Sequence, residues 1–292
     1  MASAKRQKAK QQQFDKVREK IDAQFQEGQY YEAQQLYQTL VRRQIDQESH
    51  DGAAALAQEG ASKLLEYKQG NAGGELCGML IECWKTAKAK LQPEHITTII
   101  QLFSLFPSDS KEARLSFMKA AINWSTQAGS NPHGEPALHC EMARFYRSIA
   151  DYSNAHKHYV RSRQPEEHGA ALIEWSKKGF KSERDLFLAR TVLQYLCLES
   201  IKGANVVCTV YKKEYNDGSL DTPLMNFIDF LLKTVERQAG PLFEMLKQKY
   251  APSLQRDPSL NGYLDQIGEV YFGIKAPKGM LDSLLGGLGK AF

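Results

Sequence analysis

The chain contains the pattern Tyr-x-x-Ala-x-x-x-Tyr twice, once over residues 30–37 and again over residues 152–159. Ala33 and Ala155 are small enough to let two helices cross with their backbones close together, and the aromatic ring one turn later fills the groove beside the crossing. This combination is typical of the tetratricopeptide-type helical hairpin, which stacks on its neighbours to form a solenoid. A solenoid has a large surface and few deep pockets, so the repeat favours a protein-binding scaffold over an enzyme.

The composition is that of an ordinary soluble globular protein, since 42% of the 292 residues are hydrophobic and 25% are charged. A net charge of +4 is too small to indicate a nucleic-acid partner. The five cysteines are scattered without a Cys-x-x-Cys pair, which predicts reduced thiols of a cytosolic protein rather than a disulfide framework or a zinc site. No window has the roughly 18–20 apolar residues that a membrane-spanning helix requires, so we expect no direct membrane insertion.

Apolar residues recur every three or four positions from Phe14 to Tyr271, which is the period of one helix face. The pattern predicts an all-α fold, a right-handed TPR-like α-solenoid of about fifteen antiparallel helices. The β-prone run over residues 206–210 lies within a helical pattern and is expected to be helical. The glycine-rich residues 68–74 predict a plain loop, because no strand precedes them and no Gly-Lys-Ser/Thr follows to form a phosphate cradle.

The predicted organisation has four parts. Residues 1–13 lack an apolar period and are expected to form a disordered basic arm, residues 14–130 an N-terminal half-solenoid, and residues 131–278 a C-terminal half-solenoid. The turn-rich residues 129–136 separate the two halves. The leucines of the tail, residues 279–292, could dock on the body, remain unattached or touch a membrane, but the tail lacks the basic polar face that membrane-surface helices favour.

No residue pattern indicates catalysis, a cofactor or a metal. Of the seven histidines only His156 and His158 are close in sequence, and two residues apart on a helix they point to different sides. The pair Glu166-Glu167 lies in charged, loop-like surroundings where solvated carboxylates are expected. His-Glu-x-x-His, Gly-x-Ser-x-Gly and kinase-type motifs are missing from the sequence, so we expect no enzyme.

Two groups of residues are candidates for binding partners through the N-terminal half. Tyr30 and Tyr31 are adjacent on a helix and cannot both face the same core, so one is expected to be exposed beside a basic residue as a binding hot spot. Arg42 and Arg43 close the same helix. They complement the negative end of its dipole, or they capture a carboxylate of another protein.

In the C-terminal half, the run Phe227, Phe230, Leu231 and Leu232 spreads apolar side chains around more than one face of a helix. Such a helix either meets core on two sides or leaves a groove for a segment of a partner.

A series of short segments occurs in an order that resembles one known family over about residues 15–290. The family is the α-solenoid scaffold of the tail-anchored-protein targeting (GET or TRC) pathway, and the resemblance is closest to its animal-type members because residues 212–223 are too short for the strand-forming insertion of fungal members. The matching segments are Gly28 to Ala33, Glu59 to Ala61, Lys68 to Gly70, Pro223 to Ile228, Tyr250 to Leu254, Arg256 to Pro258, Tyr263 to Gly268, Tyr271 to Gly273 and Ala276 to Lys278.

This resemblance implies a non-enzymatic scaffold without cofactors. The N-terminal half would dock the ArsA-like targeting ATPase. The resemblance places Tyr30, Arg43 and Glu75 at this ATPase face, to which we add Tyr31 and Arg42. Two positions depart from the family pattern at this face, namely Gln44 and Asp46.

The C-terminal half would hold a ubiquitin-like-domain adaptor and the large BAG-family holdase. The residues expected on this partner side are Phe227, Phe230, Leu231, Tyr263, Tyr271 and Phe272.

Two alternatives remain open on the sequence alone. A helical-repeat subunit of another cytosolic assembly, such as a proteasome-lid-like or trafficking complex, would have no affinity for the targeting ATPase. An RNA-binding helical repeat would form a salt-sensitive complex with nucleic acid, which the mild net charge disfavours.

Overall fold

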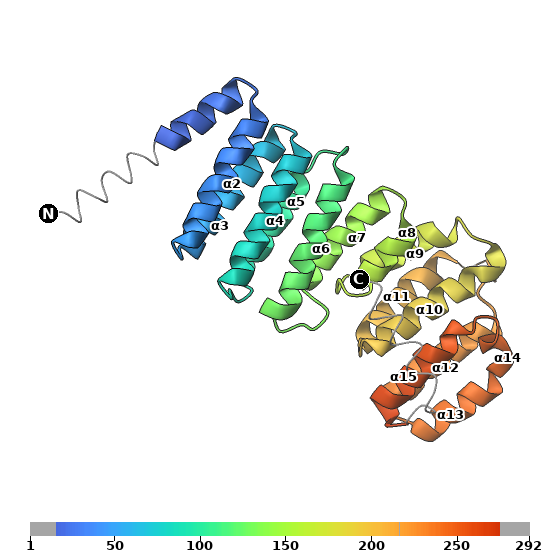
Figure 1. Ribbon diagram of the computed structural model, residues 1–292. Helices are drawn as coiled ribbons and strands as arrows, with labels where there is room; N and C mark the ends of the chain where they lie inside the picture. The colour runs from blue at the N-terminus through green and yellow to red at the C-terminus, as the bar shows by residue number, and fades with distance from the viewer. Residues whose placement is uncertain (1–15, 216, 275–292) are drawn as a thin grey trace. The chain divides into compact units, whose positions relative to one another are not determined.

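The computed structural model describes residues 16–215 and 217–274. This part of the chain is helical throughout, without a strand, and the predicted all-α solenoid is confirmed (Figure 1). The predictions for residues 1–13 and 279–292 fall outside the described residues. The chain divides into two compact units, Met1–Met142 and Ala143–Phe292, which are called unit 1 and unit 2 below.

Unit 1 is built from helices that follow one another in two rows. Helices α2, α4 and α6 pack in one row, α3 packs on α5 in the other, and neighbours in sequence join the rows (Figure 1). The helices of unit 1 are a segment over residues 16–26, α2 (Tyr30–Asp46), α3 (His50–Glu66), α4 (Gly70–Thr86), α5 (Pro93–Leu105) and α6 (Lys111–Ala128), and α7 (Pro136–Ser148) contains the boundary to unit 2.

The first four turns of unit 1 have the same backbone conformation and follow one another at a constant interval. Gly28, Glu48, Lys68 and Lys88 are evenly spaced along the chain, and all have left-handed backbones with φ of 73°, 58°, 63° and 49°. The amide N–H of the next residue donates to a carbonyl five residues back, over 2.8, 2.9, 2.8 and 3.0 Å. This is the Schellman motif, which ends a helix and satisfies its last carbonyls. Gly28 ends the helix over residues 16–26 in this way.

The prediction of a loop over residues 68–74 was wrong, because α4 begins at Gly70. Its glycines are needed for close packing rather than for a chain reversal. A Cβ added at Gly70 would lie 2.0 Å from Ser110 Oγ, and one at Gly73 would lie 2.6 Å from Leu65 Cγ. Tertiary contact therefore outweighs the low helix propensity of glycine here.

Unit 2 is organised around one central helix. α10 packs against α9, α11, α12 and α15, and its Leu188, Val192 and Leu196 are fully or almost fully buried. The β-prone residues 206–210 are helical, as expected. The helices of unit 2 are α8 (Tyr152–Tyr159), α9 (Pro165–Ser176), a 3-10 turn (Lys181–Glu183), α10 (Arg184–Cys197), α11 (Ile201–Glu214), α12 (Pro223–Glu236), α13 (Gly240–Lys249), α14 (Ala251–Leu254) and α15 (Ser259–Phe272).

Candidate partner-binding surfaces

The two adjacent tyrosines of α2 face different environments. Tyr30 is half-buried, with its ring centroid 6.0 Å from that of Phe25 and 5.4 Å from that of Tyr67. Tyr31 is 69% exposed. Successive residues of a helix point about 100° apart, so the expectation that only one of the two tyrosines faces the core is confirmed.

Tyr31 and Arg42 lie on the same face of α2 although they are far apart along it. Eleven residues separate them, which is about three turns and about 16 Å of rise. Arg42 and Arg43 are both exposed, but Arg43 points about 100° away from Arg42. The helix therefore sets Tyr31 directly beside neither arginine, and it places Arg42 alone on the face of Tyr31.

Glu75 of α4 is held against α2 by two buried amides. Gln34 Nε2 and Gln38 Nε2 both donate to Glu75 Oε2, over 2.6 and 2.9 Å. Gln34 and Gln38 are only 5% and 8% exposed. An amide donor is a neutral partner, so these bonds fix the position of the carboxylate without cancelling its charge.

Gln38 connects Glu75 to the exposed face of α2. It follows Tyr31 by seven residues and precedes Arg42 by four, so the three residues share one side of the helix. We call Tyr31, Gln38, Arg42 and Glu75 the α2–α4 strip. Sequence reasoning missed the two glutamines, whose only signal is their spacing of four residues on the helix that carries the tyrosines.

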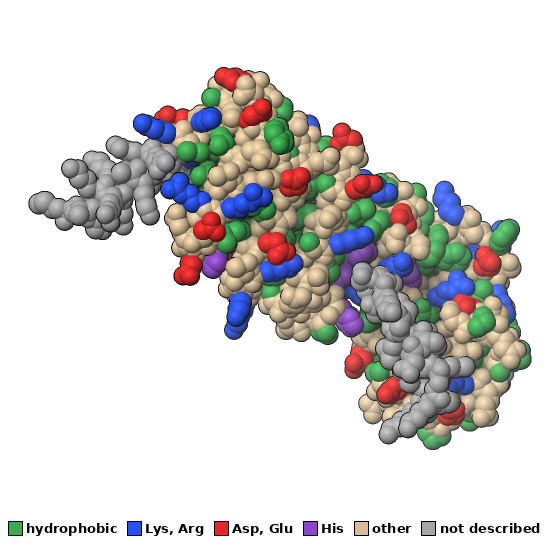
Figure 2. All heavy atoms as spheres, viewed as in Figure 1, with side chains coloured by type: hydrophobic (Ala, Val, Ile, Leu, Met, Phe, Trp, Pro, Cys, Tyr) green, Lys and Arg blue, Asp and Glu red, His purple; other side chains and the backbone are tan. Residues whose placement is uncertain are grey.

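Ion pairs join the helix over residues 16–26 to α3, which supports the end of unit 1 that carries Tyr30. Lys63 Nζ lies 2.8 Å from Asp22 Oδ1, and Arg18 pairs with Glu59. Tyr37 of α2 donates to the same Glu59 carboxylate over 3.1 Å. Burial and the nearby Glu59 carboxylate raise the pKa of Tyr37 well above its usual value. On the face in view, acidic and basic side chains are interspersed over the helices of unit 1 (Figure 2).

The apolar run of α12 faces the core for most of its length. Phe227 and Leu231 are fully buried and Leu232 is 5% exposed, whereas Phe230 is 48% exposed. Of the two outcomes expected from the sequence, contact with the core accounts for three of the four side chains. Phe230 is the one that α12 leaves exposed.

The aromatic residues of α15 are half-buried. Tyr263 accepts a hydrogen bond from Gln194 Nε2 over 2.9 Å. The ring of Phe272 lies 4.9 Å from that of Phe243 and 6.4 Å from that of Tyr271. Burial raises the pKa of Tyr271 to about 12. The end of α15 thus combines partial exposure with a firm attachment to α13.

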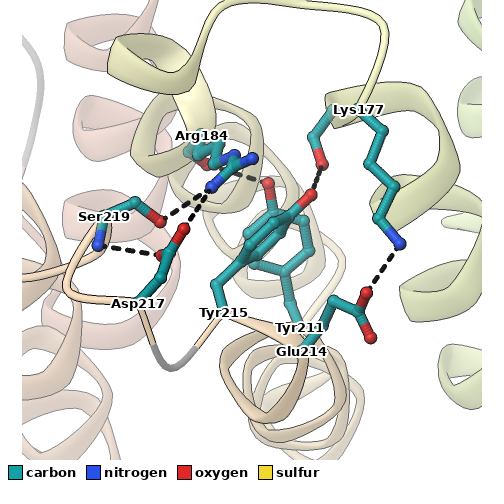
Figure 3. A network of polar contacts seen from close by, with 8 residues as sticks. Lys177, Arg184, Tyr211, Glu214, Tyr215, Asp217 and Ser219 are labelled. Carbon is teal, nitrogen blue, oxygen red and sulfur yellow. Dashed lines mark hydrogen bonds and ion pairs between the residues drawn. The ribbon is translucent and has the colours of Figure 1, made fainter.

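The connection between α11 and α12 is fastened at Arg184. Its Nη1 donates to Asp217 Oδ2 and to Ser219 Oγ, each over 3.1 Å (Figure 3). Hydrogen bonds from Ser219, ahead of the contribution of Arg184, lower the pKa of Asp217 to about 2. The connection therefore carries a negative charge at any pH near neutrality.

Two tyrosines complete this attachment from the α11 side. Tyr211 donates to the backbone carbonyl of Arg184 over 3.1 Å, and the Tyr215 ring lies 4.2 Å from the Arg184 guanidinium (Figure 3). Lys177 Nζ donates to Glu214 Oε1 over 2.6 Å nearby. The described residues between α11 and α12 are held by side chains, and no strand occurs among them.

The histidine pair that the structure forms differs from the pair that is close in sequence. His156 Nδ1 lies 2.8 Å from Nε2 of His168, and His168 Nδ1 lies 3.0 Å from the Tyr195 hydroxyl. Sequence separation concealed this contact, because α8 and α9 bring the two rings together. Burial lowers the pKa of His156 to about 4 and that of His168 well below 6.5. Both rings are neutral at pH 7, and they link α8, α9 and α10.

The description of Glu166-Glu167 as loop-like was also wrong. Both residues lie in the first turn of α9, where acidic side chains complement the helix dipole. Arg144 pairs with Glu167, and hydrogen bonding from Arg144 lowers the pKa of that carboxyl group.

Within residues 16–215 and 217–274, no three His, Cys, Asp or Glu side chains are placed to hold a metal ion. No helix in the same part of the chain is both long enough and apolar enough to cross a bilayer.

Stacked helices with exposed aromatic and charged side chains on their faces define a helical-repeat protein of the scaffold type. The chain belongs to the Golgi to ER traffic protein 4 (GET4) family, whose model matches residues 47–288.

Relatives and a solved structure agree with this assignment. The Golgi to ER traffic protein 4 homolog of Takifugu rubripes is 37% identical over 94% of this chain and 87% of its own length. The homologs of Dictyostelium discoideum and Homo sapiens are 34% and 35% identical, covering 94% and 92% of this chain and 90% and 85% of theirs. The crystal structure of C. therm. Get4 superposes with a TM-score of 0.79 at 28% identity, covering 94% of this chain and 95% of that one.

Proposed function

We propose that this chain is a non-enzymatic scaffold that delivers tail-anchored membrane proteins to the ER from the cytosol. It would bridge the ArsA-like targeting ATPase to a ubiquitin-like-domain adaptor and a large BAG-family holdase. Membership of the Golgi to ER traffic protein 4 family over most of the chain is the observation that carries this proposal.

Unit 1 is the proposed ATPase side, and the α2–α4 strip is its proposed contact surface. Tyr31 supplies exposed aromatic area, Arg42 a planar cation and Glu75 an oriented carboxylate, which are three different chemistries on one face. Tyr30 contributes by packing beneath the tyrosine end of the strip. Arg43 points away from the strip and would contact the ATPase only at its edge.

Unit 2 is the proposed side for the adaptor and the holdase. Phe230 is its most exposed candidate, and Tyr263, Tyr271 and Phe272 offer partly exposed aromatic surface on α15. Phe227 and Leu231 would support this surface indirectly by holding α12 in place, because their side chains are buried in the core.

Two partner sites on one chain give a mechanism that needs no catalysis. A scaffold that holds both partners raises the local concentration of client-loaded holdase near the ATPase. It also favours one ATPase conformation if its contacts differ between the two conformations.

The test compares two double variants that remove equal numbers of side chains from unit 1. Tyr31→Ala with Arg42→Ala is expected to weaken ATPase binding by at least about tenfold. Gln58→Ala with Gln101→Ala, which are exposed on α3 and α5 in the other row, should change it by less than about twofold. Binding of the adaptor should be unchanged in both. Equal ATPase affinity of the two variants would remove the strip from the interface, and no ATPase binding by the unaltered chain would remove the function.

A further inference from the structure

Unit 1 contains a groove that the proposed partner contacts do not use. The groove has a volume of about 750 Å³ and lies between the C-terminal end of α4, the turn over residues 87–92 and the C-terminal end of α6. Trp84 in this groove follows Glu75 by nine residues, about 13 Å along α4. The groove is therefore separate from the α2–α4 strip.

The charge of the groove has one sign. Lys85, Lys88 and Lys90 line it, and none of the described residues in its lining is acidic. Glu82 pairs with one of these lysines, since Lys85 Nζ lies 2.7 Å from Glu82 Oε1. Lys88 and Lys90 are exposed. This local excess contrasts with the chain as a whole, in which 38 basic residues are nearly balanced by 34 acidic ones.

The floor of the groove is aromatic and rigid. Trp84 and Trp124 are stacked with their ring centroids 4.9 Å apart, and the ring of His95 lies 4.6 Å from Trp84. The two tryptophans are only 8% and 2% exposed, so neighbouring side chains fix their positions. Burial lowers the pKa of His95, so this ring is neutral at pH 7 and adds no charge to the floor.

The wall of the groove is also fixed in place. The Leu91 amide donates to the Ala128 carbonyl over 2.9 Å, and the Gln92 amide donates to His95 Nδ1 over 3.2 Å. A second hollow of about 220 Å³ shares Leu91 and Gln92 with the groove and reaches Glu135. The lysines line the larger hollow and Glu135 the smaller one, and a preformed groove costs little ordering when a ligand binds.

The groove lies at the C-terminal ends of two helices, and this position affects which kind of anion can bind there. Helix C-termini present carbonyl oxygens and the negative end of the helix dipole, which repel an isolated inorganic anion. A peptide brings carboxylates for the lysines on a chain whose backbone and apolar side chains add contacts that a single small ion lacks. The size of the groove, about 750 Å³, and the mixed polarity of its lining also suit several linked residues better than one small ion.

We propose that this groove binds an acidic, extended peptide segment of a partner protein. Carboxylates of the segment pair with Lys88 and Lys90, and an apolar side chain of the segment packs against Leu91 and the exposed edge of Trp84. The site is independent of the α2–α4 strip and adds a third contact to the scaffold.

The experiment uses the full chain and a panel of short, end-blocked peptides that place one leucine or phenylalanine at different positions among glutamates. Each peptide has a counterpart with glutamine in place of every glutamate. Affinities are measured by calorimetry at low and at physiological salt. Tryptophan fluorescence gives a second readout, because two of the three tryptophans form the floor.

The matched variants reverse the same amount of charge in two places. K88E/K90E alters the groove, and K178E/K181E alters two exposed lysines of unit 2. Acidic peptides should bind at least about tenfold more tightly than their glutamine counterparts, and K88E/K90E should lose at least about tenfold of that affinity. K178E/K181E should lose less than about twofold. Equal melting temperatures of the two variants exclude unfolding as the cause.

Three results would overturn the proposal. In the first, no acidic peptide of the panel binds better than its glutamine counterpart. In the second, K178E/K181E loses as much affinity as K88E/K90E, which indicates general charge attraction. In the third, inorganic phosphate alone binds the groove with the same dependence on Lys88 and Lys90, which indicates a site for small anions.

Discussion

Unit 1 and unit 2 end their helices in the same way but assemble them differently. In unit 2, Ala150, Glu199 and Gln238 have φ of 57°, 56° and 53°, and the next residue makes the same Schellman hydrogen bond over 2.9, 2.9 and 3.0 Å. These turns are unequally and widely spaced along the chain, whereas the turns at the start of unit 1 follow one another at a short, constant interval. Both units end helices with the same Schellman turn. The number of residues between successive turns differs, and this spacing determines how the helices of each unit are arranged.

The interval decides how far apart in sequence the packed partners lie. In unit 1, α2, α3 and α4 each have 17 residues and pack on the next helix or the next but one. In unit 2, Arg190 donates to Asp257, which is 67 residues away, and Arg256 reaches back 71 residues to Asp185. Contacts between neighbours allow stability to accumulate helix by helix, while long-range contacts join a whole unit.

The largest effect should come from opening the core at matched positions in the two units. Leu196→Ala in α10 and Leu65→Ala in α3 each delete a fully buried side chain, at a cost of about 3 kcal/mol. Hydrogen exchange should then rise throughout unit 2 for Leu196→Ala, but only in α2, α3 and α4 for Leu65→Ala. The same spread of exchange in both variants would contradict the difference between the units.

A smaller loss should follow when one long-range contact of unit 2 is weakened. Asp185 is 1% exposed and accepts hydrogen bonds from both terminal nitrogens of Arg256. Asp185→Asn should cost about 2 kcal/mol in urea unfolding, because the bond to a charged group is lost in a buried place. Asp229→Asn, which weakens a partly exposed pair with Lys212, should cost less than about 0.5 kcal/mol. Equal losses in the free energy of unfolding for the two variants would show that the long-range contact stabilises unit 2 no more than a local ion pair does.

Acid should destabilise unit 2 through His156 and His168. Their pKa values in the folded state lie below the ordinary value near 6.5, mainly because of burial, so the unfolded chain binds more protons. Stability is therefore lost as pH falls below about 6.5, and the contribution of His156 levels off near its folded pKa of about 4. The slope is at most about 1.4 kcal/mol per pH unit for each ring.

His156→Gln should reduce this slope in urea unfolding measured between those pH values. The control is Leu65→Ala in unit 1, which removes no titratable group and should leave the slope unchanged. An unchanged slope in His156→Gln would mean that other groups of unit 2 dominate its acid sensitivity.

The smallest effects concern the turns themselves. Gly28→Ala should cost about 1 kcal/mol, because no atom lies within 4 Å of an added Cβ and only the left-handed backbone penalises it. Lys68→Gly should stabilise unit 1 by up to about 1 kcal/mol, since glycine relieves that backbone at some cost in unfolded-state entropy. Thermal melting of both variants measures these changes. A loss of stability in Lys68→Gly would show that its side chain matters more than its backbone.

The helical period of unit 1 could be predicted from the sequence because it depends on neighbouring residues. The spacing of apolar residues predicted helices along unit 1, and the step of about 100° between successive residues separated Tyr30 from Tyr31. The start of α4 could not be predicted, because Ser110 and Gly70 are far apart in the sequence and approach each other only in the folded chain.

Side-chain contacts between helices were harder to predict, because they join residues that are far apart in the sequence. The contact between His156 and His168 and the two amides on Glu75 depend on which helices meet. The burial of Phe227 beside an exposed Phe230 depends on the direction in which α12 faces the core. A single sequence determines the pattern of a helix face but does not reveal the neighbour that the face meets.

The even spacing of the first turns has a consequence for chain length. α2 and α4 lie in the same row with α3 between them in sequence, so inserting or deleting a pair of helix-and-turn modules would shift the later helices by one hairpin and keep each in its layer. Adding a single module would instead transfer every later helix to the opposite row. Changes in the length of unit 1 that preserve its surfaces are therefore restricted to even numbers of helices.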